Sequence, residues 1–439
     1  MTASAPATPR EGRVTRGLRR AHPAVFSAYA IIAAFATYFC MYAFRKPFTA
    51  GTFDGSVDLG PLGDLGMKSL FVVSQVFGYM ISKWAGIKIV SEMTGARRGV
   101  ALVVLIGIAE LALALFAVTP APWSAVWLFV NGLPLGMVWG LVFGFLEGRK
   151  TTEALGAGLS ASFIVASGVV KTIGLGVVNA GVSEAAMPVV VGAMFFPAFV
   201  FFVWMLTQLP RPTAEDEALR VRREPMDKKA RRAFFVAFLP GLLPLTILHF
   251  LLTALRGVRD DFAVDIWKDL GETKPELLTL TEIPVAFGVM IGLALLMLVK
   301  DNRRALVVVQ ALMAVGSALL GLATLAFDAG LLSPAVWMIL VGLGTYLAYV
   351  PFGSMLFDRL IAAVGWVGTA GFMIYVSDAV GYLGQVAVTA YQSLGSGQLS
   401  WLEFFRALTY VTSVVCVVAF LWGMYYFARK AHARPRPEV

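Results

Sequence analysis

The chain has 439 residues, of which 58% are hydrophobic and only 14% are charged, and apolar runs of about 20 residues recur along it. This composition is typical of a membrane protein and excludes a soluble globular core. The net charge of +9 lies mostly between the apolar runs, which indicates membrane topology rather than a nucleic-acid surface. Two isolated cysteines, Cys40 and Cys416, exclude a disulfide framework and a cysteine-rich metal site.

The chain begins with a polar tail, residues 1–23, that carries five arginines. The apolar run that follows is too long for a signal peptide, so we interpret it as the first membrane span. Six-helix bundles are expected at 24–209 and 233–428, joined by a charged linker at 210–232 and followed by a tail at 429–439. The expected spans are 24–46, 68–90, 98–118, 122–146, 155–179, 187–209, 233–257, 278–299, 304–326, 333–356, 367–391 and 403–428. The predicted fold class is an all-α integral membrane protein with twelve transmembrane helices in a 6+6 arrangement.

The distribution of cations predicts the orientation of the chain. If both termini are inside, the inner segments hold 25 Lys or Arg residues and the outer segments hold seven. Because Lys and Arg are retained on the cytoplasmic side, we expect both termini and the linker to be cytoplasmic in a cell inner membrane. The outer cations cluster after the first span of each half, and they include Arg45, Lys46, Arg256 and Arg259.

A weak internal repeat relates the two halves with an offset near 210 residues. Three pairs of residues anchor it: Arg45 with Arg256, Gly144 with Gly353, and Gly174 with Gly384. Parallel six-helix repeats around an axis along the membrane normal are the architecture of major facilitator transporters, whose substrate sites lie between the halves. Glycines at every fourth residue of the fourth span, 132–148, predict close helix packing, with a sliding surface for alternating access as the alternative.

Ionisable residues inside a span cost about 2.5 to 3.5 kcal/mol each, so each one needs a reason. Arg45 and Arg256 are expected at matched depth in the two halves, where two planar guanidinium groups would suit a doubly charged tetrahedral anion. The alternative is that both snorkel to lipid headgroups. The hydroxyl groups of Tyr42 and Tyr375 can donate to an oxyanion, although aromatic residues in spans usually serve packing.

Asp378 aligns with Gly168 in the repeat, three residues before Lys171, so Asp378 and Lys171 are expected on matching helix faces. They would form a gate pair across the cavity. Alternatively, Asp378 neutralises an arginine or carries a proton. Glu110 is interpreted as a packing or lipid-interface residue, and His249 as a helix residue that is not a ligand.

Four segments resemble the organophosphate:phosphate antiporters, the branch that contains the glycerol-3-phosphate and hexose-phosphate transporters. YAFRKPF (42–48) resembles the Arg-Lys signature that closes their first helix, and GYMISKWAG (78–86) resembles the stretch with their substrate-pathway lysine, here Lys83. LRGVRDDF (255–262) is similar to their seventh-helix segment and places Arg256 on the essential arginine, while the eleventh span is a looser match. The fifth span lacks the histidine of that family and has Lys171 as its only cation.

These observations predict a secondary transporter of a small anionic metabolite that works by alternating access. The resemblance implies an organic phosphate ester, exchanged for inorganic phosphate. The alternatives are a transport-incompetent sensor of such an anion and a proton-coupled transporter of another small solute. Substrate binding is assigned to Arg45, Arg256, Lys83, Lys171, Lys46 and Tyr42, and coupling or gating to Asp378, Arg259 and Tyr375.

The expected partners are the small anion and the lipid bilayer, and a monomer is favoured. We expect no enzymatic activity, cofactor, metal or nucleic-acid partner, because no span carries a His, Cys or paired-carboxylate cluster and no phosphate-binding loop motif is present.

Overall fold

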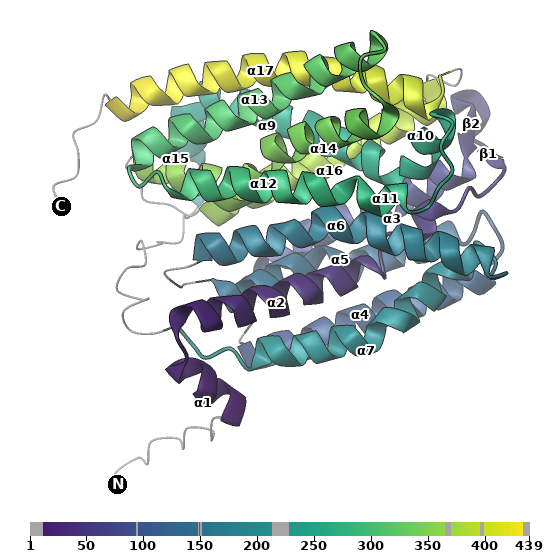
Figure 1. Ribbon diagram of the computed structural model, residues 1–439, viewed down its shortest axis with the longest axis horizontal. Coiled ribbons are helices and arrows are strands. Elements are labelled where there is room, and N and C mark those ends of the chain that lie inside the picture. The colour runs from purple at the N-terminus through teal and green to yellow at the C-terminus, as the bar shows by residue number, and fades with distance from the viewer. Residues whose placement is uncertain are drawn as a thin grey trace.

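The chain folds into two helical bundles that lie side by side in the computed structural model (Figure 1). The structure describes residues 12–93, 95–147, 149, 152–212, 228–364, 370–395 and 399–432. The first half contains α1 (Arg13–Arg20), α2 (Pro23–Tyr42), α3 (Met67–Glu92), α4 (Gly95–Val118), α5 (Ala125–Leu146), α6 (Thr152–Asn179) and α7 (Met187–Thr207). The second half contains α9 (Lys228–Asp261), α10 (Ala263–Asp269), α11 (Leu277–Leu280), α12 (Glu282–Met297), α13 (Asn302–Asp328), α14 (Pro334–Pro351), α15 (Phe357–Val364), α16 (Ala370–Gly395) and α17 (Trp401–His432).

Short elements complete the chain. Two 3-10 turns, η1 (Pro47–Ala50) and η2 (Gly60–Leu62), lie between α2 and α3. The same connection carries a small antiparallel hairpin of β1 (Ser56–Asp58) and β2 (Asp64–Gly66), in which Val57 lies opposite Leu65. A π-helical turn, η3 (Phe352–Leu356), joins α14 to α15, so that these three elements form one long span.

All twelve predicted spans correspond to helices, but they differ in polarity. Ten spans among the described residues are long and apolar enough to cross a membrane, and α3 and α16 are not among them. These two helices carry the polar side chains that face the other half: Ser69 of α3 bonds Ser393 of α16, and Tyr79 of α3 packs on Tyr382 of α16. The polar residues therefore lie along the boundary between the bundles.

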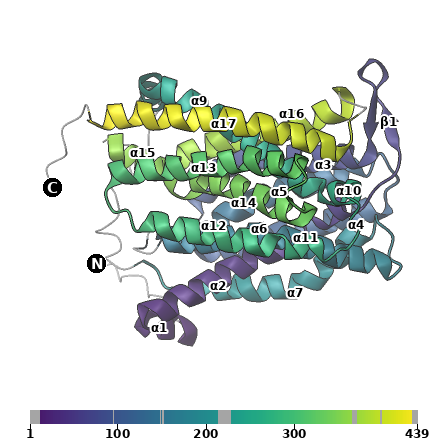
Figure 2. The ribbon, with the colours of Figure 1, turned by 45° about the horizontal axis from the view of Figure 1, so that its top comes forward.

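The two ends of the bundle differ in what they carry. The first residues of α2 and the last residues of α17 lie at one end, and the β-hairpin and α10 lie at the other (Figures 1 and 2). We call these the termini end and the hairpin end. The arrangement agrees with an even number of crossings, in which successive helices run in opposite directions.

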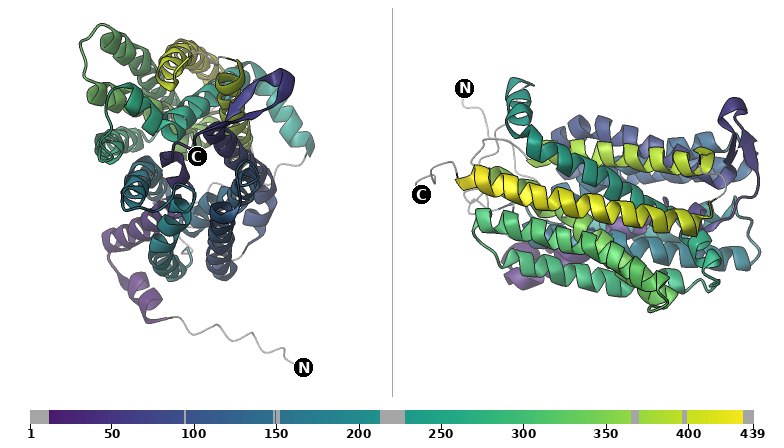
Figure 3. Two further views of the ribbon diagram at one scale, coloured as in Figure 1. Left: turned by 90° about the vertical axis from the view of Figure 1, so that its right-hand side faces the viewer. Right: turned by 90° about the horizontal axis from the view of Figure 1, so that it is seen from above.

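Each half has its own hydrophobic core, and the left view of Figure 3 shows the helices of the two halves end-on as two groups. The first core is built around residues such as Phe71, Phe116 and Phe199, and the second around Trp337 and Phe420. A few apolar side chains cross from one half to the other core, namely Phe262, Tyr382, Ala157 and Ile164. Each bundle is therefore packed mainly around its own core, which is the architecture that rigid-body movement of two halves requires.

The glycines of the fourth predicted span permit close packing of α5. A Cβ atom on Gly132 would run into the backbone oxygen of Gln75 on α3, and one on Gly136 would meet Ser82 of the same helix. The predicted close packing is confirmed at these two positions. The alternative of a sliding surface stays a prediction.

The loop after η1 is fixed by a carboxylate from the α6–α7 connection. Glu184 accepts hydrogen bonds from the backbone N–H groups of Thr52 (3.0 Å) and Phe53 (2.9 Å) and from the Thr52 hydroxyl (2.9 Å). They help hold Phe53 at φ 47°, a left-handed conformation that is rare outside glycine. Burial alone would raise the pKa of Glu184, but these hydrogen bonds favour the charged carboxylate and leave its pKa below its usual range.

Several predicted boundaries differ from the structure, and three of the differences are informative. The first span ends at Tyr42 rather than 46, because Pro47 cannot continue the helix. Helix α9 begins at Lys228, inside the predicted linker 210–232, and α17 extends to His432, past the predicted end at 428. Polar residues thus prolong these helices beyond their apolar windows.

Candidate functional site

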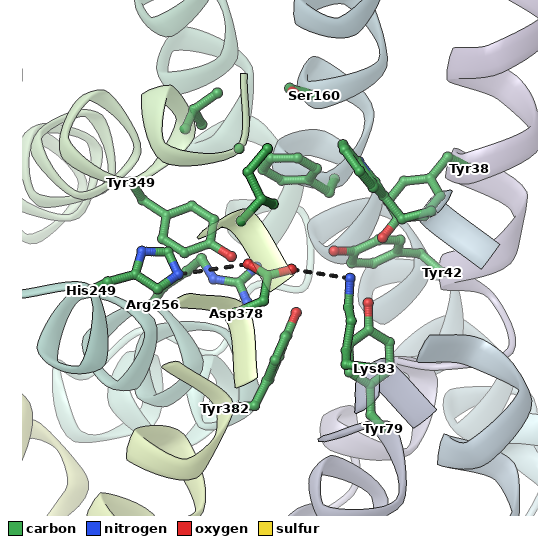
Figure 4. Close-up of a pocket in the computed structure, with 15 residues that line it drawn as sticks. Tyr38, Tyr42, Tyr79, Lys83, Ser160, His249, Arg256, Tyr349, Asp378 and Tyr382 are labelled. Atoms are coloured by element: carbon green, nitrogen blue, oxygen red, sulfur yellow. Dashed lines mark ion pairs between the residues drawn. The ribbon is translucent and has the colours of Figure 1, made fainter. Parts of the chain in front are cut away.

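A cavity lies between the two halves and draws its walls from both of them (Figure 4). Its empty volume is about 570 Å³, including the part that is open to solvent. The polar lining from the first half comes from α2, α3 and α6, and that from the second half comes from α9, α14 and α16. These residues include Tyr38, Tyr42, Tyr79, Lys83, Ser160, His249, Arg256, Tyr349, Asp378 and Tyr382.

Arg256 lines the cavity from the last part of α9. Its side chain is only 8% exposed, and its guanidinium group lies over the ring of Tyr349 at 4.6 Å. The Nε atom is buried without a hydrogen-bond partner. Arg256 forms no ion pair with a carboxylate anywhere in the described part of the chain.

Arg45 is also buried, at 2% exposure, but it lies one layer behind the cavity wall. Its guanidinium group stacks over Tyr79 at 4.0 Å and lies 5.9 Å from the ring of Tyr42, and both tyrosines line the cavity. Its Nε atom is unpartnered, and within the described ranges no carboxylate pairs with it either. The sequence predicts equal positions for the two arginines, whereas the structure makes them unequal in this conformation.

The backbone around Arg45 explains its place. The residues after α2 form an irregular turn whose carbonyl groups have no helical partner. Gln75 donates to the Arg45 carbonyl (2.9 Å), and Asn131 donates to the Phe44 carbonyl (3.0 Å), while the two amides bond each other (2.8 Å). This buried amide network holds the turn that carries Arg45 and Lys46.

Asp378 of α16 lies across the cavity from Lys83 of α3. The distance from Lys83 Nζ to Asp378 Oδ2 is 3.2 Å, so this ion pair joins the two halves. His249 Nε2 lies 3.7 Å from the other carboxylate oxygen, Oδ1. Of the cavity-lining residues that the structure describes, Asp378 is the one carboxylate.

A second charged group, which we call the hairpin-end cluster, lies next to the cavity toward the hairpin end. It consists of Lys46, Lys171, Asp260, Asp261 and Gln385. Lys46 Nζ pairs with Asp260 Oδ2 (2.6 Å) and with Asp261, and Lys171 Nζ pairs with Asp260 Oδ1 (2.9 Å). Gln385 donates to Asp261 Oδ2 (2.6 Å). Two cations and two carboxylates balance here, and each ion pair joins the first half to the second.

Chain positions show that the hairpin-end cluster borders the cavity. Along α9, Asp260 follows Arg256 by one turn toward the hairpin end. Along α6, Lys171 lies two turns beyond Phe163, another lining residue. A further pair, Lys68 with Asp265 (2.6 Å), also joins the halves at this end. The cavity is thus closed by ion pairs toward the hairpin.

In this conformation several residues of the sequence-based assignments have partners that the sequence did not predict. Lys171 and Asp378 do not pair with each other, because Lys171 binds Asp260 and Asp378 binds Lys83. Lys46 and Lys171, assigned to substrate, are engaged in the hairpin-end cluster. Arg259, assigned to coupling, pairs with Glu282 (2.7 Å) and donates to the Met338 carbonyl (3.1 Å), both in its own half.

Four of the assigned site residues line the cavity. Tyr42 and Lys83 line the cavity, together with Asp378 and Arg256. The side chain of Tyr375 lies outside the described residues. Glu110 packs against Gly192 of α7 at a distance from the cavity lining, as expected of a packing residue.

Sequence reasoning missed His249, which lines the cavity, and the carboxylates Asp260 and Asp261. The available signal was the acidic pair inside LRGVRDDF. In the repeat this segment of the second half corresponds to the segment of the first half that carries Arg45 and Lys46. Across the ranges that the structure covers, no group of three His, Cys, Asp or Glu residues is arranged to hold a metal ion.

A protein-family model with the description "Family of unknown function (DUF5690)" matches residues 47–430. No curated protein matches the sequence.

Solved structures with a similar fold are transporters of the major facilitator superfamily. The proton:xylose symporter XylE shares 13% identity at a TM-score of 0.64, with 93% of this chain and 97% of XylE covered. A bacterial homologue of the human lysosomal transporter Spinster shares 13% identity at a TM-score of 0.60, with 95% and 100% covered. The human organic anion transporter MFSD10 shares 15% identity at 0.53, with 92% and 100% covered. These likenesses confirm the predicted 6+6 major facilitator fold.

Proposed function

The chain belongs to DUF5690, a family of unknown function, and from this site we propose that it is a secondary transporter of a small anion, most suitably an organic phosphate ester exchanged for inorganic phosphate. We place it in a cell inner membrane with both termini cytoplasmic, on the strength of the cation distribution. In that orientation the hairpin end faces outward.

One observation carries the proposal: the cavity and the layer directly behind its wall hold buried positive charge without a matching acid. Arg45, Arg256 and Lys83 supply three cations, and Asp378 supplies one carboxylate, which is already paired with Lys83. Taking an ion out of water costs several kcal/mol, and a cation–π contact with tyrosine returns only about 0.5 to 2 kcal/mol. A bound dianion would neutralise the two uncompensated charges.

The chemistry of the donors favours a phosphoryl group. A guanidinium group binds two oxygens of a phosphate at once, stays charged at any working pH, and is less strongly hydrated than an ammonium group. Tyrosine hydroxyls on both sides of the cavity supply further donors for the remaining oxygens. The resemblance of the segments around Arg45, Lys83 and Arg256 to organophosphate:phosphate antiporters supports the same substrate class.

Transport follows from the two-bundle architecture. With the hairpin-end cluster formed, the site is closed on one side, and an anion reaches Arg256 and Lys83 from the other. Rocking of the halves would break the ion pairs of Lys46 and Lys171 with Asp260 and open the cavity toward the hairpin. The proteins with similar structures include a xylose symporter and an organic anion transporter, so the fold is compatible with different solutes. The argument for the substrate therefore depends on the cavity itself.

The test is counterflow in proteoliposomes that contain the purified protein. We expect exchange of labelled inorganic phosphate against internal phosphate, competition by phosphate esters, and no competition by neutral sugars. Exchange of neutral sugars but not of any anion would refute the proposal. Binding of phosphate without exchange would instead identify an anion sensor.

A further inference from the structure

The anion site contains a feature that an anion clamp does not need. Asp378 places a carboxylate in the wall of a cavity that is otherwise positive, where it repels an entering anion and occupies Lys83. An ionised group at this depth is expensive to insert, so its presence requires a function. The residue that faces its second oxygen indicates that function.

The two oxygens of Asp378 face different partners. Oδ2 lies 3.2 Å from Lys83 Nζ, whereas Oδ1 faces His249 Nε2 at 3.7 Å, too far for a hydrogen bond (Figure 4). Neither ring nitrogen of His249 has a hydrogen-bond partner, although the side chain is only 1% exposed. Its ring stacks on Tyr349 at 5.3 Å, which holds it against the cavity. A carboxylate and an unpartnered imidazole thus lie together on the wall.

We propose that Asp378 and His249 form a proton site that is coupled through Lys83 to occupancy of the anion site, so that one proton travels with each anion, and that the emptied protein can reorient, which adds net proton–anion symport to the exchange. This inference rests on the proposed function. When an anion enters, Lys83 Nζ leaves Asp378 Oδ2 and turns to the anion. The Asp378–His249 pair then takes up one proton from water in the cavity, as an O–H bond on the carboxylate or an N–H bond on the imidazole. Release of the anion returns Lys83 to Asp378 and expels the proton to water.

The surroundings determine the direction of the coupling. The titratable and charged groups that face Asp378 come from four neighbouring helices and from α16 itself: Tyr38 and Tyr42 on α2, Tyr79 and Lys83 on α3, His249 and Arg256 on α9, Tyr349 on α14, and Tyr382 on α16. In the empty site the cations Lys83 and Arg256 oppose a proton on the pair. A bound anion cancels their charge, so anion binding favours proton uptake, and proton uptake favours anion binding to the same extent.

The experiment uses the full chain in proteoliposomes with inorganic phosphate as the probe and the membrane potential clamped at zero. Two quantities are measured: exchange of phosphate at equal pH, and accumulation of phosphate driven by an inward proton gradient of one pH unit. For one proton per anion, wild-type protein is expected to accumulate phosphate up to about tenfold. Asp378→Asn is expected to exchange phosphate but to reach an accumulation ratio near one. Glu110→Gln, which changes a membrane carboxylate away from the cavity, is the matched control and should accumulate like wild type.

Each other outcome has a defined meaning. Accumulation by Asp378→Asn at the wild-type level overturns the inference, because the proton then travels on the anion itself. Exchange by wild type without accumulation also overturns it and leaves the transporter standing, whereas no exchange by wild type refutes the proposed function.

A second variant covers the case in which Asp378→Asn does not fold. His249→Gln keeps the Asp378–Lys83 pair, and it is expected to exchange phosphate with an accumulation ratio near one. Accumulation at the wild-type level in His249→Gln would show that the imidazole is not part of the proton site and would overturn the Asp378–His249 pair. Loss of exchange in both variants, with folded protein, would overturn the inference, because a proton site distinct from the anion clamp must be removable without loss of exchange.

Discussion

Replacing Arg256 by lysine tests the anion clamp most directly, because the charge is kept while the planar fork is lost. Arg256 is buried, lines the cavity and has a free Nε atom. The substitution removes one bidentate, charge-assisted contact, which is worth about 2 to 3 kcal/mol. We therefore expect the affinity for inorganic phosphate to fall about 30- to 160-fold.

Arg259→Lys provides the matched control on the same helix, one turn further along. Arg259 pairs with Glu282 and the Met338 carbonyl inside the second half and does not line the cavity. Its substitution is expected to leave the affinity for phosphate within about twofold of wild type. Arg45→Lys should give an intermediate loss, because Arg45 lies behind Tyr79 and acts on the cavity through that ring.

The assay is a calorimetric titration of each purified, folded variant with inorganic phosphate, followed by counterflow in proteoliposomes. An affinity of Arg256→Lys within about threefold of wild type would refute the reasoning, since a snorkelling arginine tolerates lysine. An equal loss in Arg259→Lys would show that the effect does not depend on the cavity.

Four further predictions address the rest of the structure. Asp260→Asn removes a partner of two lysines, so labelling of a cysteine introduced in the cavity wall at Ser160 should rise at least about fivefold from the hairpin side, and unchanged labelling would contradict a gate. Gly132→Ala pushes a methyl group into the backbone of α3 and should cost about 1 to 3 kcal/mol, seen as a lower Tm, whereas Gly107→Ala meets no atom and should not lower it. Because the folded-state pKa of Glu184 is depressed, its contribution to stability is present above the unfolded-state pKa and is lost as pH falls through the folded-state value. Glu184→Gln should therefore lower Tm at pH 7, with the difference from wild type shrinking in acid. A cysteine introduced at position 220 should not be labelled by membrane-impermeant thiol reagents added to intact cells, and labelling there would contradict the predicted cytoplasmic linker.

Most of the fold could be predicted because apolar length and cation asymmetry act locally. The apolar composition of each span predicts it without reference to the rest of the chain, and the repeat at an offset near 210 residues indicates how the halves are related. The boundaries were less predictable, since helices such as α9 continue into polar residues where hydrogen bonding no longer depends on the apolar window.

The site was predicted by residue type better than by partner. Burial cost in a membrane singled out Arg256, Lys83 and Asp378, which do line the cavity. In this conformation Lys171 pairs with Asp260 and Asp378 with Lys83, partners that the repeat does not indicate because it predicts matching helix faces but says nothing of depth or of competing acids. Asp260 lies near a helix end, where a carboxylate is ordinary, and only the folded chain shows that it meets Lys46 from the other half.

The polarity of α3 and α16 has a consequence for how the chain enters the bilayer. Each charged residue at the centre of a span opposes insertion by about 2.5 to 3.5 kcal/mol, and Lys83 and Asp378 lie in the two predicted spans that are not among the long, strongly apolar helices of the described chain. Helix α3 inserts early, with strongly apolar α4 directly behind it. Helix α16 leaves the ribosome after all of the first half has been made. The order of synthesis therefore brings Asp378 to the membrane after Lys83, its ion-pair partner and counter-ion, has been made.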